Sequence, residues 1–254
     1  MTETQKTAVI FGLANKRSIA WAIAQKLHAA GWRLAVSYLN ERLGLEAKDL
    51  IAELPGAEGF MCDVSKDEEI AQLFAQLREK YGVLHGLVHS IGLAPPAELK
   101  QPFLETSREG FRIAHDISVY SLIALSRGAA PLMSAGGSIV TLTYYGAQKV
   151  VPNYNVMGVA KAALESTVRY LAHDLGPRGI RVNAVSAGPI KSLAARAIAN
   201  FNDMQKTLVE RAPLRRNVDT AEVGSTAEFL LSEGGSGITG ETIYVDCGYN
   251  IMGF

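Results

Sequence analysis

Short apolar runs alternate along the chain with longer segments in which apolar residues recur at helical spacing. The short runs predict seven strands: Thr7–Phe11, Arg33–Tyr38, Ala57–Met61, His85–Ser90, Gly137–Thr143, Ile180–Ser186 and Glu241–Asp246. The longer segments predict helices over Ser18–Ala30, Glu41–Leu54, Lys66–Tyr81, Phe111–Met133, Asn155–Leu175 and Thr220–Ser232. Several strands, such as Ala8–Phe11, are apolar without interruption, which indicates that helices cover both of their faces.

The alternation of strands and helices predicts the fold class. We expect an α/β protein: a single Rossmann-like, doubly wound domain over residues 1–254, with a seven-stranded parallel sheet and helices on both faces. A chain of 254 residues is an ordinary length for one such domain. The segment 188–217 is the least predictable. Ligands of such sheets bind beyond the carboxyl ends of the strands, so functional side chains are expected directly after strands.

Charge and composition exclude several classes of protein. Lys and Arg total 25 and so do Asp and Glu, which argues against a dedicated nucleic-acid binder. No apolar stretch is long enough for a membrane span and Met1–Thr7 is polar, so we expect a cytoplasmic protein without a signal peptide. Cys62 and Cys247 are expected to be packing residues. His85 and His89 share a strand face without a third ligand, so no metal site is predicted.

The turn after the first predicted strand keeps part of a phosphate-binding pattern. The fingerprint G-x-G-x-x-G would need glycine at Ala14 and Arg17 as well as at Gly12. Gly12 still allows a sharp turn, and Ser18 could cap a helix that begins at Ile19. The free N–H groups of such a helix can hold a pyrophosphate. An ordinary strand–turn–helix connection explains this segment equally well.

Two further strand ends carry candidate contacts for a dinucleotide. Asp63 follows the third strand, where its carboxylate could accept from an adenine amino group while Val64 packs on the ring. Alternatively, Asp63 only caps the next turn. The fourth strand ends in Ser90, Ile91 and Gly92, and glycine there lets a ribose approach the backbone closely.

Two tyrosine–lysine pairs compete after the fifth predicted strand. Tyr145 and Lys149 are four residues apart, but four-residue spacing aligns side chains only on a helix, and Pro152 follows closely. Tyr154 and Lys161 are nearly two helical turns apart, and Lys161 lies within a strong helix candidate. We therefore favour the second pair, with a helix-end aromatic and a solvated lysine as the alternative.

Taken together, these segments resemble the short-chain dehydrogenase/reductase superfamily. They are most similar to its divergent branch, the bacterial enoyl-[acyl-carrier-protein] reductases of fatty-acid synthesis. The resemblance covers essentially the whole chain. The motifs on which it rests are Gly12-x5-Ser18-x-Ala20, Asp63-Val64, Ser90-Ile91-Gly92, Tyr144-x9-Tyr154-x6-Lys161, Ala187-Gly188-Pro189-Ile190 and Gly240-Glu241-x-x-Tyr244-Val245-Asp246. Met157 stands where commoner superfamily members have a tyrosine four residues before the lysine.

The resemblance implies a reaction and three catalytic residues. Hydride from a reduced nicotinamide adds to C3 of a trans-2-enoyl thioester, and negative charge develops on the thioester oxygen. Tyr154 would donate a hydrogen bond to that oxygen. Lys161 would hold the ribose hydroxyls of the nicotinamide. Tyr144 would wall the acyl pocket and assist proton delivery to C2.

The resemblance also implies binding residues for the cofactor and the substrate. The cofactor-binding residues would be Gly12, Ser18, Ile19, Leu39, Asp63, Val64, Ser90, Ile91, Gly92, Lys161, Ile190, Lys191, Ser192, Leu193 and Ala194. Substrate-binding residues would be Ala94, Tyr144, Tyr154 and Phe201, with residues 190–216 as a substrate lid.

The expected cofactor is NAD, with NADH as the hydride donor and NADPH not excluded. No cluster of basic residues follows the second strand, where Leu39 stands and where a 2′-phosphate would need an arginine. Arg42 is the one basic residue close by. In some related proteins a polar residue stands at the position of Leu39.

The expected partners are acyl carrier protein and further copies of the chain. Segment 191–216 carries six basic and two acidic residues, which could steer an acidic carrier protein, although a solvated helix face is an alternative. We expect a homotetramer. The predicted helices Phe111–Met133 and Asn155–Leu175 are rich in apolar and small residues, and related enzymes pair these helices across one two-fold axis and the last strand across another. The apolar end of the run Tyr249–Phe254 suits burial between subunits. Two other functions stay open: a carbonyl reductase or alcohol dehydrogenase of the same superfamily, and a non-catalytic dinucleotide-binding protein.

Overall fold

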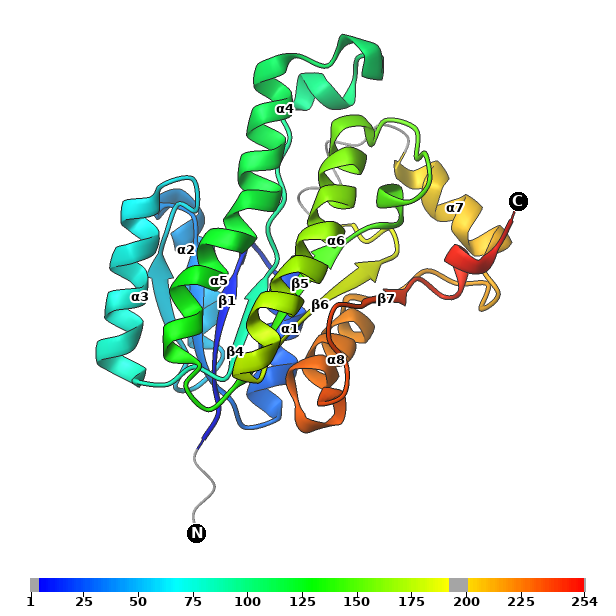
Figure 1. Ribbon diagram of the computed structural model, residues 1–254. Coiled ribbons are helices and arrows are strands. Elements are labelled where there is room, and N and C mark those ends of the chain that lie inside the picture. Colours follow the sequence, from blue (N-terminus) through cyan, green and yellow to red (C-terminus); the bar gives the residue numbers. More distant parts are fainter. Residues whose placement is uncertain (1–4, 192–200, 254) are drawn as a thin grey trace.

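The computed structural model describes residues 5–191 and 201–253, which contain one parallel sheet. Its strand order is β3-β2-β1-β4-β5-β6-β7 (Figure 1). The strands are β1 (Thr7–Phe11), β2 (Arg33–Tyr38), β3 (Glu58–Met61), β4 (Gly86–His89), β5 (Gly137–Thr143), β6 (Ile180–Ala187) and β7 (Thr242–Val245). This arrangement confirms the predicted fold class, a Rossmann-like sheet of seven strands.

Helices cover both faces of the sheet (Figure 1). One face packs against α1 (Ile19–Ala29), α2 (Glu41–Ala52) and α8 (Thr220–Leu231). The other packs against α3 (Asp67–Tyr81), α5 (Ser121–Ala129) and α6 (Asn155–Leu175). Successive residues of a strand point to opposite faces, so Ile10 and Val9 of β1 belong to the two different apolar cores.

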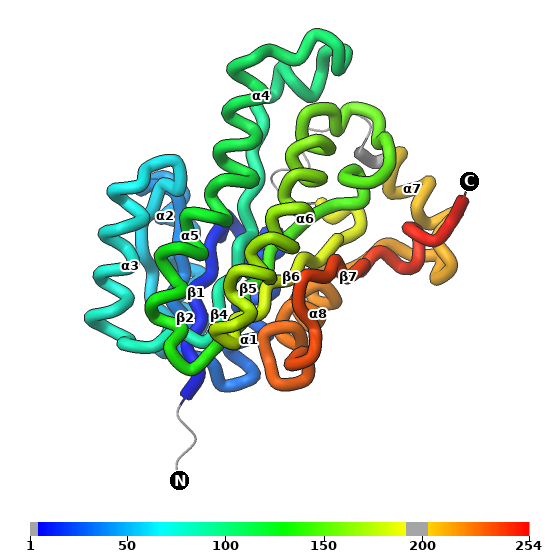
Figure 2. The backbone as a smooth tube through the Cα atoms, in the orientation of Figure 1, coloured from blue at the N-terminus to red at the C-terminus, as the bar shows by residue number. Residues whose placement is uncertain are grey.

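The helix predicted over Phe111–Met133 differs most from the observed structure. Helix α4 (Arg108–His115) begins three residues earlier, because the hydroxyl of Ser107 accepts a hydrogen bond from the Gly110 N–H. A π-helical turn over Asp116–Tyr120 then connects it to α5. Figure 2 shows α4 extending beyond the carboxyl ends of the strands.

Helix α7 (Phe201–Arg211) was not predicted, since it lies in the segment 188–217. Its pattern was nevertheless present in the sequence. Leu208 and Ala212 are buried at four-residue spacing, and Met204 lies one turn before them. The other predicted helices and strands agree with the observed ones within one or two residues at each end.

The described residues include no helix that is both long and apolar enough to cross a membrane. Both cysteines are free and buried, as packing residues should be. His89 is fully buried between the hydroxyls of Thr141 and Ser121, each 2.8 Å from a ring nitrogen. Burial lowers its pKa to about 3, so this histidine is a neutral core residue.

Candidate active site

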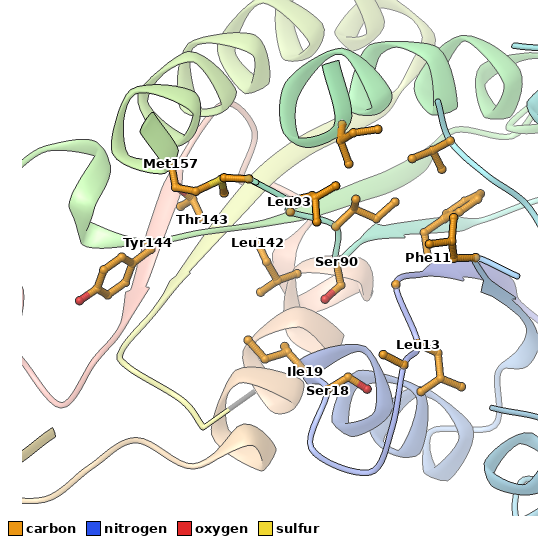
Figure 3. A pocket seen from close by; sticks show the side chains of 18 of the residues that line it. Phe11, Leu13, Ser18, Ile19, Ser90, Leu93, Leu142, Thr143, Tyr144 and Met157 are labelled. Atoms are coloured by element: carbon orange, nitrogen blue, oxygen red, sulfur yellow. The ribbon is translucent and has the colours of Figure 1, made fainter. Parts of the chain in front are cut away.

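A cavity of about 720 Å³ opens at the carboxyl ends of the strands. Its walls include the ends of β1, β4, β5 and β6, on both sides of the point between β1 and β4 where the strand order reverses. This is the location at which doubly wound sheets bind ligands. Fourteen of the predicted site residues line the cavity: Gly12, Ser18, Ile19, Leu39, Asp63, Val64, Ser90, Ile91, Gly92, Ala94, Tyr144, Tyr154, Lys161 and Ile190 (Figure 3 shows several of them).

Five further predicted residues are not among those that line the described part of the cavity. Lys191 is exposed and does not line the cavity. Ser192, Leu193 and Ala194 lie outside the described residues, as does the side chain of Phe201, whose backbone begins α7. The predicted lid, residues 190–216, therefore contributes Ile190 and Met204 to the described wall of the cavity.

Gly12 brings the end of β1 close to the end of β4. Its φ is +97°, which favours glycine, and a Cβ atom there would overlap the carbonyl oxygen of Ser90. The Ser90 N–H also donates to the carbonyl oxygen of Phe11 at 3.1 Å. A side chain at position 12 would therefore force these two chain segments apart, and the tight turn depends on glycine.

Ser18 is the N-cap residue of α1, but its side chain does not cap the helix as predicted. The hydroxyl instead donates to the carbonyl oxygen of Asn15, which the local turn brings within 2.5 Å. The Trp21 N–H donates to the backbone oxygen of Ser18 at 3.1 Å, so within the described residues the N–H groups of Ile19 and Ala20 are the ones at the start of α1 that can serve an anion. This arrangement fits a pyrophosphate, as the N-terminal end of a helix favours negative charge.

Asp63 caps the next turn and also borders the cavity. Its Oδ1 accepts from the N–H and the hydroxyl of Ser65, as a turn cap does, and the residue also lines the cavity. Burial alone would raise the pKa of this carboxyl, but the hydrogen bonds from Ser65 and the Lys66 charge hold the pKa below its ordinary value. Asp63 is therefore an ionised acceptor at neutral pH.

Lys161 lies inside the site rather than in solvent. It is 6% exposed, and its Nζ donates to the carbonyl oxygen of Leu142 at 2.8 Å. A Cβ atom on Gly92 would lie 3.5 Å from the same nitrogen. Burial lowers the pKa of Lys161 to about 8, against the opposing effect of the Glu165 charge. A buried amine with an altered pKa that borders a cavity is typical of functional sites.

Tyr154 and Tyr144 face each other in the wall of the same cavity as this lysine. Tyr154 immediately precedes α6, and Tyr144 immediately follows β5. Their ring centroids lie 5.0 Å apart in an edge-to-face arrangement. Burial is the main effect on both hydroxyls and raises both pKa values well above the ordinary range. Both tyrosines therefore stay protonated at neutral pH and can act as hydrogen-bond donors.

The other tyrosine–lysine pair, Tyr145 and Lys149, lies away from the cavity. Tyr145 belongs to a short 3-10 turn and donates from its hydroxyl to the carbonyl oxygen of Asn250 at 3.3 Å. Lys149 is exposed, and neither residue lines the cavity. The structure thus separates Lys149 from Lys161 by environment, which the spacing of the two pairs alone could not do.

Sequence reasoning missed several apolar residues of the cavity wall. Leu99 and Ile117 come from the segment between β4 and α5, and Met204 comes from α7. Only the helical period around Met204 offered a signal in the sequence. The described residues contain no cluster of three or more side chains that could hold a metal ion.

The site has apolar walls, a helix N-terminus for an anion, and two tyrosines beside a buried lysine. This combination on a Rossmann-like sheet defines the class, a dinucleotide-binding oxidoreductase. A family model described as "Enoyl-(Acyl carrier protein) reductase" matches residues 12–250. The chain belongs to this family of enoyl-[acyl-carrier-protein] reductases, which act in fatty-acid synthesis.

Individual relatives are similar along nearly their whole length. The NADH enzyme FabI of Bacillus subtilis is 51% identical, with 97% of this chain and 96% of the relative covered. The NADPH enzyme FabI of Staphylococcus aureus strain MRSA252 is also 51% identical, with 97% of each covered. A crystal structure of the Bacillus cereus reductase with NADP+ and indole naphthyridinone is 49% identical, with a TM-score of 0.97 over 100% of both chains.

Proposed function

We propose that this protein reduces the C2=C3 bond of trans-2-enoyl thioesters through Tyr154, Lys161 and Tyr144. The observation that carries the proposal is the buried Lys161 beside two protonated tyrosines at the carboxyl end of the sheet. The bound reduced nicotinamide supplies the hydride that adds to C3.

Tyr154 is the proposed donor to the thioester oxygen, where negative charge develops in the transition state. Its burial keeps the hydroxyl protonated, and the apolar wall excludes water that would compete for the oxygen. One donor of this kind is typically worth about 2.7–4 kcal/mol of transition-state stabilisation. Tyr144 packs edge-to-face on the Tyr154 ring, so it orients that ring, walls the acyl pocket and assists proton delivery to C2.

Gly12, the N-terminus of α1 and Lys161 fit the cofactor. Gly12 allows the tight turn after β1, which a side chain would disrupt, and the first turn of α1 offers N–H groups to a pyrophosphate. Lys161 holds the ribose hydroxyls as a charged donor, and Asp63 with Val64 receives the adenine. In the segments that are not described, Ser192 to Ala194 would border the pyrophosphate.

We infer a preference for NADH over NADPH. Leu39 and Leu43 line the cavity after β2, whereas Arg42 between them is exposed and does not. Asn40 is engaged in capping α2, since its side chain accepts from the Leu43 N–H at 3.1 Å. Lys16, in the turn between β1 and α1, forms an ion pair with Glu53 at 3.3 Å. The end of β2 therefore offers apolar contacts and little positive charge for a 2′-phosphate.

Acyl carrier protein is the proposed macromolecular substrate, with the basic stretch 191–216 as its docking surface. Not all of its charges are available. Arg216 makes two hydrogen bonds to Glu222, of 2.8 and 2.6 Å, so its charge is partly neutralised. Lys191, Arg211 and Arg215 are exposed and would interact with an acidic partner.

A homotetramer in the cytoplasm is the proposed state of the protein. Exposed apolar side chains lie on α6 and at the C-terminal end, among them Val159, Tyr170 and Ile251, at 38%, 73% and 73% exposure. Burial between subunits would remove them from water. Light scattering at micromolar concentration tests this, and a monomeric mass would refute it.

A substrate comparison tests the proposed activity. The protein is mixed with NADH or NADPH and a crotonyl thioester, and oxidation of the cofactor is followed by absorbance. The same mixture with a ketone is the comparison. Oxidation with the enoyl thioester alone supports the proposal, whereas oxidation with the ketone alone would indicate a carbonyl reductase. Cofactor binding without either reaction would indicate a dinucleotide-binding protein without catalysis.

A further inference from the structure

A buried carboxylate lies one helical turn after Lys161, and the reaction described above makes no use of it. Glu165 of α6 is 7% exposed. Its Oε1 accepts a hydrogen bond of 2.9 Å from the hydroxyl of Thr143, the last residue of β5. Ionisable side chains are rarely buried to this extent, because removal of a charge from water is unfavourable. The burial of the Glu165 carboxylate therefore needs a structural or functional explanation.

Glu165 and Lys161 together join α6 to the end of β5. Lys161 donates to the backbone oxygen of Leu142, and Glu165 accepts from the side chain of Thr143. Consecutive turns of one helix thus hold consecutive residues of one strand. The next residue along the chain is Tyr144, whose ring packs on Tyr154 at the start of the same helix. Figure 3 shows Leu142, Thr143 and Tyr144 in this order at the strand end.

The surroundings of Glu165 are polar and largely buried, although Thr143 also borders the cavity and Tyr244 is half-buried. Thr143 of β5 is in register with Ser186 of β6, which is in register with Tyr244 of β7, so the three hydroxyl side chains share one face of the sheet. Within the described residues, the hydroxyls of Ser186 and Tyr244 are buried without a hydrogen-bond partner. A charge in such a place is weakly screened, so it acts on its neighbours more strongly than a surface charge would.

We propose that Glu165 is a positioning residue of the active site, which fixes Tyr144 through its hydrogen bond with Thr143 and places a carboxylate one helical turn from Lys161. The proposal rests on the proposed functions of Tyr144 and Lys161. The Glu165 charge raises the pKa of Lys161 against the larger effect of burial. Burial raises the pKa of Glu165 itself, against the lowering effects of the hydrogen bond from Thr143 and of the Arg169 and Lys161 charges. The other groups that face this pair are His89 of β4, which is neutral above about pH 3, Arg169 of α6 and Tyr244 of β7.

The charge of Glu165 is tested in the cofactor-free protein. NMR titration of isotope-labelled lysine side chains reports the pKa of Lys161, whose signal is identified by its loss in Lys161→Ala. In Glu165→Gln we expect that pKa to fall by roughly one unit, since an opposite charge one helical turn away on the same helix favours the charged amine. Asp174→Asn, which removes an exposed carboxylate of the same helix, is the matched control and should leave it unchanged. An unchanged Lys161 pKa in Glu165→Gln would overturn the electrostatic part.

The link through Thr143 is tested by kinetics. Thr143→Val keeps the shape and removes the hydroxyl, and we expect kcat for a crotonyl thioester to fall roughly tenfold or more, because small displacements of catalytic groups are costly. The cofactor Kd should change little. Thr143→Ser retains the hydroxyl and should recover most of the lost rate. A parent-like kcat in Thr143→Val, or no recovery in Thr143→Ser, would overturn the positioning part.

The two tests also separate this proposal from the proposed function. The Lys161 titration needs neither cofactor nor substrate, so it decides the electrostatic part even if the parent protein reduces no enoyl thioester. Circular dichroism checks the fold of each variant. If Glu165→Gln does not fold, the titration is repeated with Thr143→Val, in which a lost hydrogen bond weakens the hold on the carboxylate. The proposal then requires a changed Lys161 pKa in that variant, and an unchanged pKa together with unchanged kcat would overturn it.

Discussion

Replacement of Lys161 by alanine is expected to weaken dinucleotide binding far more than replacement of any surface lysine. The side chain is 6% exposed, lines the cavity and lies close to Gly92, where a ribose can approach the backbone. Charge-assisted hydrogen bonds from its amine are worth about 1.5–3 kcal/mol. Cofactor affinity should therefore fall roughly 10- to 150-fold, because about 1.4 kcal/mol corresponds to a factor of ten.

Fluorescence titration with NADH and NADPH measures this loss directly. Lys149→Ala is the matched control, since Lys149 is exposed and outside the cavity, and surface substitutions usually change stability by less than about 0.5 kcal/mol. Lys161→Met is a second test that keeps most of the buried volume and removes the charge. Parent-like affinity in both Lys161 variants, or a large loss in Lys149→Ala, would refute the assignment of the ribose site.

Three further predictions concern the same site. Tyr154→Phe should lower kcat by roughly 100- to 1000-fold at nearly unchanged cofactor Kd, because a transition-state donor is worth about 2.7–4 kcal/mol. Equal effects on Kd and kcat, in binding and steady-state measurements, would contradict this. Gly12→Ala should abolish cofactor binding and lower Tm, because the φ of residue 12 is +97° and the new Cβ overlaps the Ser90 carbonyl. A normal cofactor affinity in a calorimetric titration would contradict the need for glycine in this turn. Cofactor affinity should be full below about pH 7 and decline as pH rises through about 8, because the pKa of Lys161 is lowered to about 8 and the charged amine binds the cofactor. A cofactor affinity that stays constant up to about pH 9.5 would argue against a charged lysine at the ribose.

The central strands could be predicted from the sequence because they are buried on both faces. The apolar runs of β1, β2 and β5 have the same ends in the structure as in the prediction. Helix α6 also has its predicted ends, because an amphipathic pattern runs through all of Asn155–Leu175. The strand order was not predicted, because no pattern along the chain states which strands pair.

The side-chain environments could not be predicted, because they depend on tertiary contacts. Ser18 has the residue type and position of a helix cap, yet its hydroxyl bonds to the Asn15 carbonyl that the local turn brings closer. Glu165 looks like one of many helix carboxylates until the sheet places Thr143 beside it. The start of α4 was missed because Phe111 was the first clearly apolar position, whereas the cap is at Ser107.

Direct transfer of the cofactor hydride to C3 of an enoyl thioester is the central claim. Reduction of a crotonyl thioester with NADH deuterated at the transferred position, followed by NMR of the product, tests this claim most directly. The expected product is a saturated thioester with deuterium at C3 and a solvent-derived proton at C2. Deuterium at another carbon, a product still unsaturated between C2 and C3, or loss of the label to water would contradict the claim.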